Sequence, residues 1–303
     1  MTVGRRAVTV NTAGRPPVIA LLSPGSMGSA VGARLAAHGA TVLTSLAGRG
    51  EATGRRAHAA GMADATDTQI ARADIILSIL PPGDAEPLAR RLLPHLAALD
   101  AARPLYIDAN ALSPESKRGI AGLLAPAGVA MVDGGIVGPP PGSGGREPTI
   151  YLSGPDAARG RILGDLGLKI EILDGPIGAA AALKMSYAAI NKGVVALAVA
   201  GMLAADRAGA GAALQAEMAA SMPDLLARFR RQVPDTYPKA YRWVAEMREI
   251  AAFLGAEAGG AEMFEGAARL FEAMAADVAG AGTDRAALDR MLGTPQPDVE
   301  ART

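Results

Sequence analysis

Short apolar segments alternate with helix-length segments through the first 173 residues of this 303-residue chain, and this alternation restricts the folds it can adopt. The helix-length segments include Met27–His38, Asp84–Leu99 and Pro114–Leu124. The expected strands are Val18–Leu22, Thr41–Thr44, Asp74–Leu80, Leu105–Asp108, Val129–Val132, Thr149–Leu152 and Lys169–Leu173. Strands that alternate with helices in this way predict an α/β domain of the Rossmann type, with a doubly wound, mostly parallel sheet.

The pattern changes at Asp174-Gly175-Pro176, after which strand signals end and alanine-rich helical sequence follows. Alanine is the best helix former, so we expect an all-α second domain. Helix breaks are expected at Met222-Pro223, Val233-Pro234, Tyr237-Pro238 and Gly259-Gly260, which predict about four or five helices. We therefore divide the chain into an N-terminal extension (1–17), an α/β domain (18–175) and an all-helical domain (176–303).

Composition excludes several classes of protein. The chain has no cysteine, so it can form neither a disulfide nor a thiolate metal site. Its three histidines, His38, His58 and His95, are not spaced as zinc ligands, and we expect no metal. Thirty basic residues balance thirty acidic ones, which argues against nucleic acid or an anionic membrane as the main partner.

The sequence also bears on location. The longest apolar run, Gly193–Ala205, is shorter than the roughly 18–20 residues that span a bilayer. Residues 1–17 contain no apolar stretch of signal-peptide length. We therefore expect a cytoplasmic protein whose partner is a small-molecule substrate.

A glycine-rich segment, Ser23-Pro24-Gly25-Ser26-Met27-Gly28, follows the first strand and opens a helix. It matches the dinucleotide fingerprint G-x-G-x-x-G, with serine in place of the first glycine. The second glycine lets the backbone approach a pyrophosphate, and the helix N-terminus binds the phosphates. The alternative is a glycine-rich turn without a ligand. We assign five residues of this segment to the cofactor: Ser23, Gly25, Ser26, Met27 and Gly28.

The end of the second strand bears on the choice between NAD and NADP. NAD sites usually place an acidic residue about 20 residues beyond the fingerprint, where it accepts from the ribose hydroxyls. The stretch 43–49 has no acidic residue, but it contains Ser45 and Arg49, and Arg55 and Arg56 follow. A hydroxyl and a guanidinium suit the 2′-phosphate of NADP, so NADP is preferred over NAD. Alternatively, the arginines only solvate a loop.

Two further strands end in segments that we place beside the cofactor. Leu80-Pro81-Pro82 and Asp108-Ala109-Asn110 each close a predicted strand. Ligands of open α/β sheets bind outside the carboxyl ends of the strands. We therefore assign Leu80, Pro81, Pro82 and Asn110 to the cofactor site, although both segments could be ordinary turns.

Lys184 lies in an alanine-rich helical segment, and Tyr187 and Asn191 follow it at spacings that share one helix face. Burial among apolar neighbours lowers the pKa of a lysine and makes it a usable general acid or base. The alternative is that the side chain reaches solvent past its apolar neighbours.

Together these motifs resemble the β-hydroxyacid dehydrogenase family, relatives of 6-phosphogluconate dehydrogenase. The landmarks are the fingerprint, Leu80–Pro82, Val132-Asp133-Gly134-Gly135 and Lys184, in the order of the family. The second domain, with Ser221–Asp224 and Arg242–Met247, resembles the DUF1932 helical domain.

The resemblance implies hydride transfer between NADP and the carbinol carbon of a small hydroxy acid, with Lys184 shuttling the hydroxyl proton. It also implies a homodimer with the active site at the domain junction. Two positions depart from the family. Its usual serine in the glycine-rich substrate loop is Val137, and its asparagine four residues after the lysine is Ala188. Tyr187 and Asn191 could compensate as catalytic residues. The substrate-binding residues implied are Gly134, Gly135, Ile136 and Val137.

Two other functions stay open. An imine reductase shares this fold but generally carries Asp or Tyr in place of the lysine, so Lys184 argues against it and Tyr187 for it. A non-catalytic NADP-binding sensor would use Lys184 only structurally. In the helical domain, Trp243 and Met247 are better explained as core or pocket wall than as cofactor contacts, and Glu246 could face the pocket. The available anion partners there are Arg228, Arg230, Arg231, Lys239 and Arg242.

Overall fold

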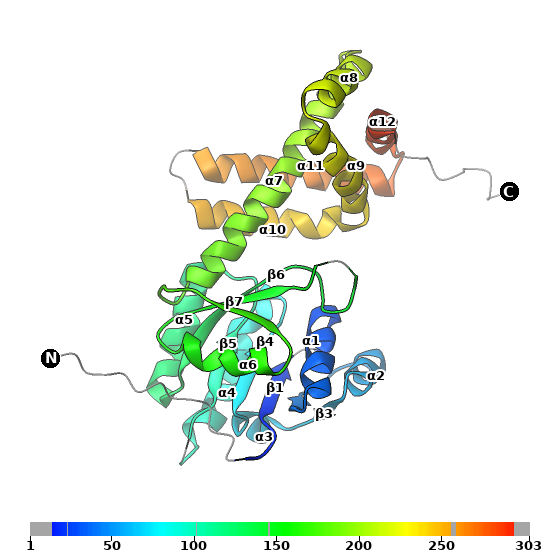
Figure 1. Ribbon diagram of the computed structural model, residues 1–303. Coiled ribbons are helices and arrows are strands. Elements are labelled where there is room, and N and C mark those ends of the chain that lie inside the picture. Colours follow the sequence, from blue (N-terminus) through cyan, green and yellow to red (C-terminus); the bar gives the residue numbers. More distant parts are fainter. Residues whose placement is uncertain (1–13, 23, 101, 145, 256–258, 294–303) are drawn as a thin grey trace. The chain divides into compact units, whose positions relative to one another are not determined.

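A computed structural model describes residues 14–22, 24–100, 102–144, 146–255 and 259–293 (Figure 1). Ser23 and most of the N-terminal extension lie outside the described residues. The chain divides into two compact units, one ending at Lys184 and the other beginning at Met185.

The first unit contains one eight-stranded sheet of order β3-β2-β1-β4-β5-β6-β7-β8. Every neighbouring pair is parallel except β6 with β7, which is antiparallel. This confirms the mostly parallel, doubly wound sheet. The order reverses between β1 and β4, and ligands bind at such a switch point. The strands are β1 (Val18–Leu22), β2 (Thr41–Thr44), β3 (Met62–Asp64), β4 (Ile75–Ser78), β5 (Leu105–Asp108), β6 (Met131–Val137), β7 (Thr149–Ser153) and β8 (Lys169–Ile172).

Helices cover both faces of this sheet. Ile19 and Leu21 of β1 belong to a core with residues of α1 (Ser26–Ala37), α2 (Glu51–Ala59) and α6 (Ile162–Asp165). Ala20 and Leu22 belong to a second core, on the opposite face. The helices of that second face are α3 (Asp67–Ala71), α4 (Ala85–Ala97) and α5 (Pro114–Leu124). Because helices cover both faces, the central strands β1, β4 and β5 are largely buried, mostly apolar runs, whereas the edge strand β8 alternates polar and apolar residues.

Two strand predictions need correction. No sequence pattern indicated β3, which has three residues, of which Met62 alone is buried. The strand expected at Val129–Val132 begins instead at Met131 and continues to Val137. Gly134 and Gly135 therefore lie in a strand, not in a loop. Antiparallel pairing with β7 extends β6 through these glycines, although glycine is a poor strand former.

From Ala179 onward the described residues form six α-helices, more than the four or five expected. The break between the first two, at 208–210, was not predicted. Pro234 does not end a helix, because the last turn that contains it is held by the fully buried Val233 and Thr236. The other three expected breaks are confirmed. The helices are α7 (Ala179–Arg207), α8 (Gly211–Ser221), α9 (Pro223–Thr236), α10 (Ala240–Leu254), α11 (Gly260–Ala279) and α12 (Thr283–Leu292).

Helix α7 is 29 residues long and is apolar enough in length and composition to cross a bilayer. The length of the uninterrupted apolar run, Gly193–Ala205, therefore underestimated the length of this apolar helix, because α7 also contains Lys184 and Lys192. One such helix is weak evidence for a membrane protein, since core helices of soluble proteins pass the same test. Ile190 and Leu197 on α7 are 68% and 65% exposed.

Candidate active site

The glycine-rich segment forms an uncapped helix N-terminus. Gly25 occupies the N-cap position of α1, and no side chain of the described residues caps the helix. The first backbone N–H groups of α1 are therefore free to bind an anion. A Cβ at Gly25 would meet no protein atom within 4 Å, so packing does not demand glycine there. The open backbone fits the close approach of a pyrophosphate.

A cavity of about 200 Å³ lies at the carboxyl ends of β1, β2 and β4, and Ser45, Arg49 and Leu80 share its lining. Ser45 is nearly buried, whereas Arg49 is exposed. Of the other two arginines, Arg55 pairs with Glu51. Arg56 donates from Nε to the carbonyl of Pro24, 3.1 Å away, and so ties α2 to the fingerprint. The hydroxyl and guanidinium expected for a 2′-phosphate thus line one cavity.

Two carboxylates near this cavity were not anticipated: Asp84 lines it, and Asp64 lies beside the loop that follows β2. Asp64, at the end of β3, accepts a hydrogen bond from the backbone N–H of Leu46 at 2.8 Å. Its Oδ1 therefore holds the loop that follows β2. Pro82 lines a separate cavity of about 390 Å³, and Pro81 precedes the short 3₁₀ helix Pro82–Asp84.

Asn110 joins the ends of β4 and β5. Its Oδ1 accepts from the backbone N–H of Leu80, and its Nδ2 donates to Ser78 Oγ at 2.8 Å. Its own backbone N–H donates to Asp108 Oδ1 at 3.0 Å. Asn110 therefore fixes the position of Leu80, and both of its side-chain polar atoms are already engaged.

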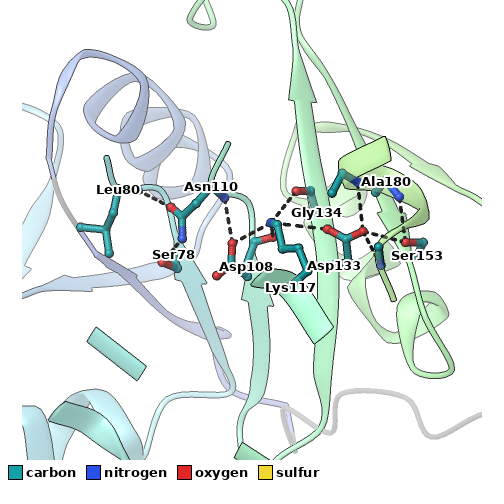
Figure 2. Close-up of polar contacts among 11 residues, drawn as sticks. Ser78, Leu80, Asp108, Asn110, Lys117, Asp133, Gly134, Ser153 and Ala180 are labelled. Carbon is teal, nitrogen blue, oxygen red and sulfur yellow. Dashed lines mark hydrogen bonds and ion pairs between the residues drawn. The ribbon is translucent and has the colours of Figure 1, made fainter. Parts of the chain in front are cut away.

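A fully buried lysine, Lys117 of α5, lies next to Asp108 (Figure 2). Its Nζ donates to the carbonyl oxygen and to Oδ1 of Asp108, both at 2.6 Å, and to the carbonyl of Gly134 at 3.1 Å. It also pairs with Asp133 Oδ1 at 3.4 Å. Both carboxylates are fully buried as well. A buried ion cluster of this kind is held by its hydrogen bonds and is costly to break.

Asp133 and Ser153 cap helix α7 from neighbouring strands. Asp133 Oδ2 accepts from the backbone N–H groups of Gly178 and Ala181, at 2.9 and 3.0 Å. Ser153 Oγ donates to the same oxygen at 3.1 Å and accepts from the N–H of Ala180 at 3.0 Å. A carboxylate at this end also complements the helix dipole. Figure 2 shows the resulting row of contacts from Leu80 to Ala180.

Lys184 follows this capped turn on α7, and its side chain is partly buried. A Cβ added at Gly135 would meet the carbonyl oxygen of Ala180 at 2.6 Å and Lys184 Cβ at 3.4 Å. Gly135 therefore allows β6 to approach α7 where the lysine lies. Burial, and then the positive charge of Lys117, lower the pKa of Lys184 from 10.5 to about 8, against the opposing effect of Asp108 and Asp133.

Tyr187 and Asn191 lie on α7 beyond Lys184, in the second unit. Tyr187 is 50% exposed. Asn191 Oδ1 accepts from Arg228 at 2.7 Å and from Gln232 at 3.3 Å, both on α9. Asn191 is thus held by α9, and the contacts described do not join it to Lys184.

Several of the other expected residues of the helical unit have structural partners. Glu246 forms an ion pair with Lys192, whose ammonium lies 5.0 Å from the ring centroid of Trp243. Trp243 packs edge-on against Phe271, with ring centroids 5.1 Å apart, and Met247 is fully buried. Met247 belongs to the core of this unit, and Trp243 packs against that core. Arg230 donates to the carbonyl of Leu292, Lys239 lies in the 3₁₀ helix Tyr237–Lys239, and Arg231 and Arg242 are exposed.

The expected substrate segment lies entirely within β6. Gly134, Gly135, Ile136 and Val137 are all buried. The side chain of Ile136 contributes to the core of the sheet, packed with residues such as Ile150 of β7. Gly134 contributes its carbonyl to Lys117. The two glycines therefore offer backbone rather than side chains to the surroundings of Lys184.

Comparison with known families accounts for most of the chain. Residues 18–164 match the NAD binding domain of 6-phosphogluconate dehydrogenase, and residues 205–274 match DUF1932, a domain of unknown function. Residues 18–164 form a 6-phosphogluconate dehydrogenase-type NAD-binding domain. Proteins with this NAD-binding domain are NAD(P)-dependent oxidoreductases, which is the class of enzyme that the sequence predicts.

Solved structures share the fold over nearly the whole chain. A conserved protein of unknown function, described as structurally similar to 3-hydroxyacid dehydrogenases, is 27% identical; the match covers 89% of this chain and 99% of that one, with a TM-score of 0.73. The 3-hydroxyisobutyrate dehydrogenase of Mycobacterium tuberculosis is 19% identical, with coverages of 92% and 99% and a TM-score of 0.62. An imine reductase of Streptomyces aurantiacus is 21% identical, with coverages of 91% and 99% and a TM-score of 0.54. No curated protein matches the sequence.

Besides the carboxylates near the cavity, sequence reasoning missed Lys117 and Ser153 of this NAD-binding domain, and it did not assign Asp108 or Asp133 to the site. A signal for Lys117 was present, because Lys117, Ile120 and Leu124 share one buried face of α5 at spacings of three and seven residues. Ser153 carried no local signal, since its partners are 20 and 27 residues away. Among the described residues, no group of three or more His, Asp or Glu is placed to hold a metal ion.

Proposed function

We propose that this chain is an NADP-dependent oxidoreductase that interconverts a small hydroxy acid and the corresponding oxo acid or a related carbonyl compound. The observation that carries the proposal is the position of Lys184. It lies on α7 near the buried Lys117, Asp108 and Asp133, with a pKa lowered to about 8. An acid–base catalyst works best with a pKa near the working pH.

In this proposal, different residues of the first unit bind the cofactor and transfer the proton. The N-terminus of α1 binds the pyrophosphate, and Ser45 and Arg49 bind the 2′-phosphate. When bound, NADP(H) supplies or accepts the hydride. The Lys184 ammonium donates a proton to the carbonyl oxygen during reduction, and its neutral amine takes the hydroxyl proton during oxidation. Each proton is exchanged with solvent between turnovers.

The NADP preference predicts a selective effect of Arg49→Ala. A hydrogen bond to a charged group contributes about 1.5–3 kcal/mol, so we expect the KM for NADPH to rise about 10- to 100-fold while the KM for NADH stays the same. Arg55→Ala, which removes a guanidinium that pairs with Glu51, is the control and should change neither. Equal effects of Arg49→Ala on both cofactors would argue against a 2′-phosphate site.

A substrate panel tests the function itself. Loss of NADPH absorbance is followed with small 2- and 3-oxo acids, semialdehydes and cyclic imines. We expect turnover of an oxo acid or semialdehyde. Silence across the panel, together with measurable NADPH binding, would favour the sensor over the enzyme.

Imine reduction is the second candidate, and Tyr187 favours it. This phenol lies three residues beyond Lys184 on α7 and is half exposed, so it could supply the proton in place of the lysine. Turnover of cyclic imines that survives Lys184→Met and is lost in Tyr187→Phe would support this candidate and contradict the leading one.

We further propose that the protein is a cytoplasmic homodimer. The support for the homodimer is an apolar groove of about 280 Å³ between α7 and α11, lined by residues such as Leu197, Met263 and Leu270. Leu197 and Met263 are largely exposed. Large exposed apolar side chains gathered in one groove are typical of an interaction surface, and sedimentation velocity will report the dimer directly.

A further inference from the structure

Lys117 is the one fully buried lysine among the described residues, and the function proposed above gives it no task. Its ammonium bonds two carbonyl oxygens and one carboxylate oxygen, with a second carboxylate oxygen at 3.4 Å. It thereby connects the end of β5 with the middle of β6. Burying an ammonium costs several kcal/mol even when it is paired. An apolar side chain at this position would avoid that cost, so the lysine indicates a role that an apolar residue cannot fill.

The first consequence is mechanical. Lys117 contacts Asp133 through Oδ1, and Asp133 binds the first turn of α7 through Oδ2. On the other side, Asp108 Oδ1 accepts from Asn110, whose side chain holds Leu80. Lys117 is thus the central member of one polar row that runs from the cofactor edge of the sheet to the helix of Lys184 (Figure 2).

The second consequence is electrostatic. The cluster contains two carboxylates and one ammonium, so one negative charge has no counterpart within it. Asp108 Oδ2 and Asp133 Oδ1 are both buried without a hydrogen-bond donor among the described residues. Lys184 is a further cation on which these charges act, and the guanidinium of Arg118 on α5 lies close to Gly178, which binds Asp133 Oδ2. The groups that act on it are Lys117 of α5, Asp108 of β5 and Asp133 of β6.

We propose that Lys117 is a positioning residue for Lys184: with Asp108 and Asp133, its buried ammonium fixes the turn that carries Lys184 and balances the charge that this amine experiences. The inference deepens the proposed function and rests on it for its catalytic meaning. The four groups form a set that is neutral when Lys184 is protonated. Loss of the Lys184 proton leaves one negative charge, which favours recapture of a proton after each turnover.

Two substitutions that should shift the pKa of Lys184 in opposite directions test this proposal. Lys117→Met removes a positive charge and should raise the pKa of Lys184, whereas Asp108→Asn removes a negative charge and should lower it, each by about one unit. The double variant Lys117→Met/Asp108→Asn removes one charge of each sign and should return the pKa toward the wild-type value. Asp108→Asn preserves shape, and its Oδ1 can still accept from Asn110, so it remains informative if Lys117→Met fails to fold.

The measurement is competitive acetylation. The intact protein is labelled with trace acetic anhydride from pH 6 to pH 11, and mass spectrometry gives the acetylation rate of Lys184 at each pH. The exposed Lys169 of β8 is the internal control and should give one curve in all variants. Because labelling needs no substrate, the result stands even if the chain reduces nothing in the panel. Lys184 curves that do not move, or that move in the same direction in both single variants, would overturn the proposal.

Discussion

Lys184→Met is expected to lower kcat for the reduction by about 10²- to 10⁴-fold, the usual contribution of a positioned general acid. Methionine keeps a long unbranched side chain, so the variant removes the proton carrier with little change in volume. The residues assigned to NADPH lie elsewhere in the first unit, and its Kd should therefore remain within about twofold. Stopped-flow turnover and fluorescence titration of NADPH check the two expectations.

The same variant is expected to be more stable than the wild type at pH 7. The pKa of Lys184 is about 8 in the folded protein, against 10.5 for an unperturbed lysine, so folding disfavours the charged amine. Below pH 8 this penalty is complete, and it disappears as the pH rises from 8 to 10.5. We expect Lys184→Met to add about 1–3 kcal/mol to the free energy of unfolding at pH 7.

A matched control is Lys169→Met, which replaces an exposed lysine of the same unit and should change neither activity nor stability by more than about 0.5 kcal/mol. Full activity of Lys184→Met would remove the lysine from the reaction. A loss of both activity and stability would instead make Lys184 a structural residue, as the sensor hypothesis requires.

Asp133→Ala should give the largest loss of stability, about 3–5 kcal/mol, because it breaks a buried ion pair. The substitution leaves Lys117 with one fewer counter-charge and strips the N–H groups of Gly178 and Ala181 of their acceptor. Glu51→Ala removes an ion pair that is exposed on both sides and should cost less than about 1 kcal/mol. Urea unfolding followed by circular dichroism measures both.

The single tryptophan, Trp243, lies in the helical unit, so its fluorescence reports that unit while circular dichroism reports both. For Asp133→Ala we expect the unfolding transition to occur at a lower urea concentration by circular dichroism than by Trp243 fluorescence. Equal stability of Asp133→Ala and Glu51→Ala would show that the cluster around Lys117 contributes little to the fold.

Local sequence patterns were enough to predict the sheet and the fingerprint helix. The bounds expected for β1, β2 and β5 agree with the structure. For β1 and β5 the reason is that largely buried strands are mostly apolar runs between turn residues. β3 was missed because three residues are too short for such a pattern. β6 was cut short because Gly134 and Gly135 are poor strand formers, and only their antiparallel partners on β7 extend the strand.

The candidate site was less accessible to sequence reasoning. Lys184 stood out as a charge within an alanine-rich helix. Lys117 did not, because the Ser-Pro-Glu-Ser-Lys-Arg segment around it has the composition of an exposed helix start. Its burial follows from the approach of β5 and β6, which places Asp108 and the Gly134 carbonyl around the amine. The cap of α7 is similar, since Gly178 offers no side chain and the acceptors come from residues 133 and 153.

The central claim, that Lys184 carries the proton, is tested most directly by the pH dependence of kcat for NADPH-driven reduction by the wild type. With the pKa of Lys184 lowered to about 8, the rate should be constant at lower pH. It should fall tenfold per pH unit above about pH 8, as the ammonium is lost. A rate independent of pH from 6 to 10 under conditions in which chemistry limits turnover would contradict the account.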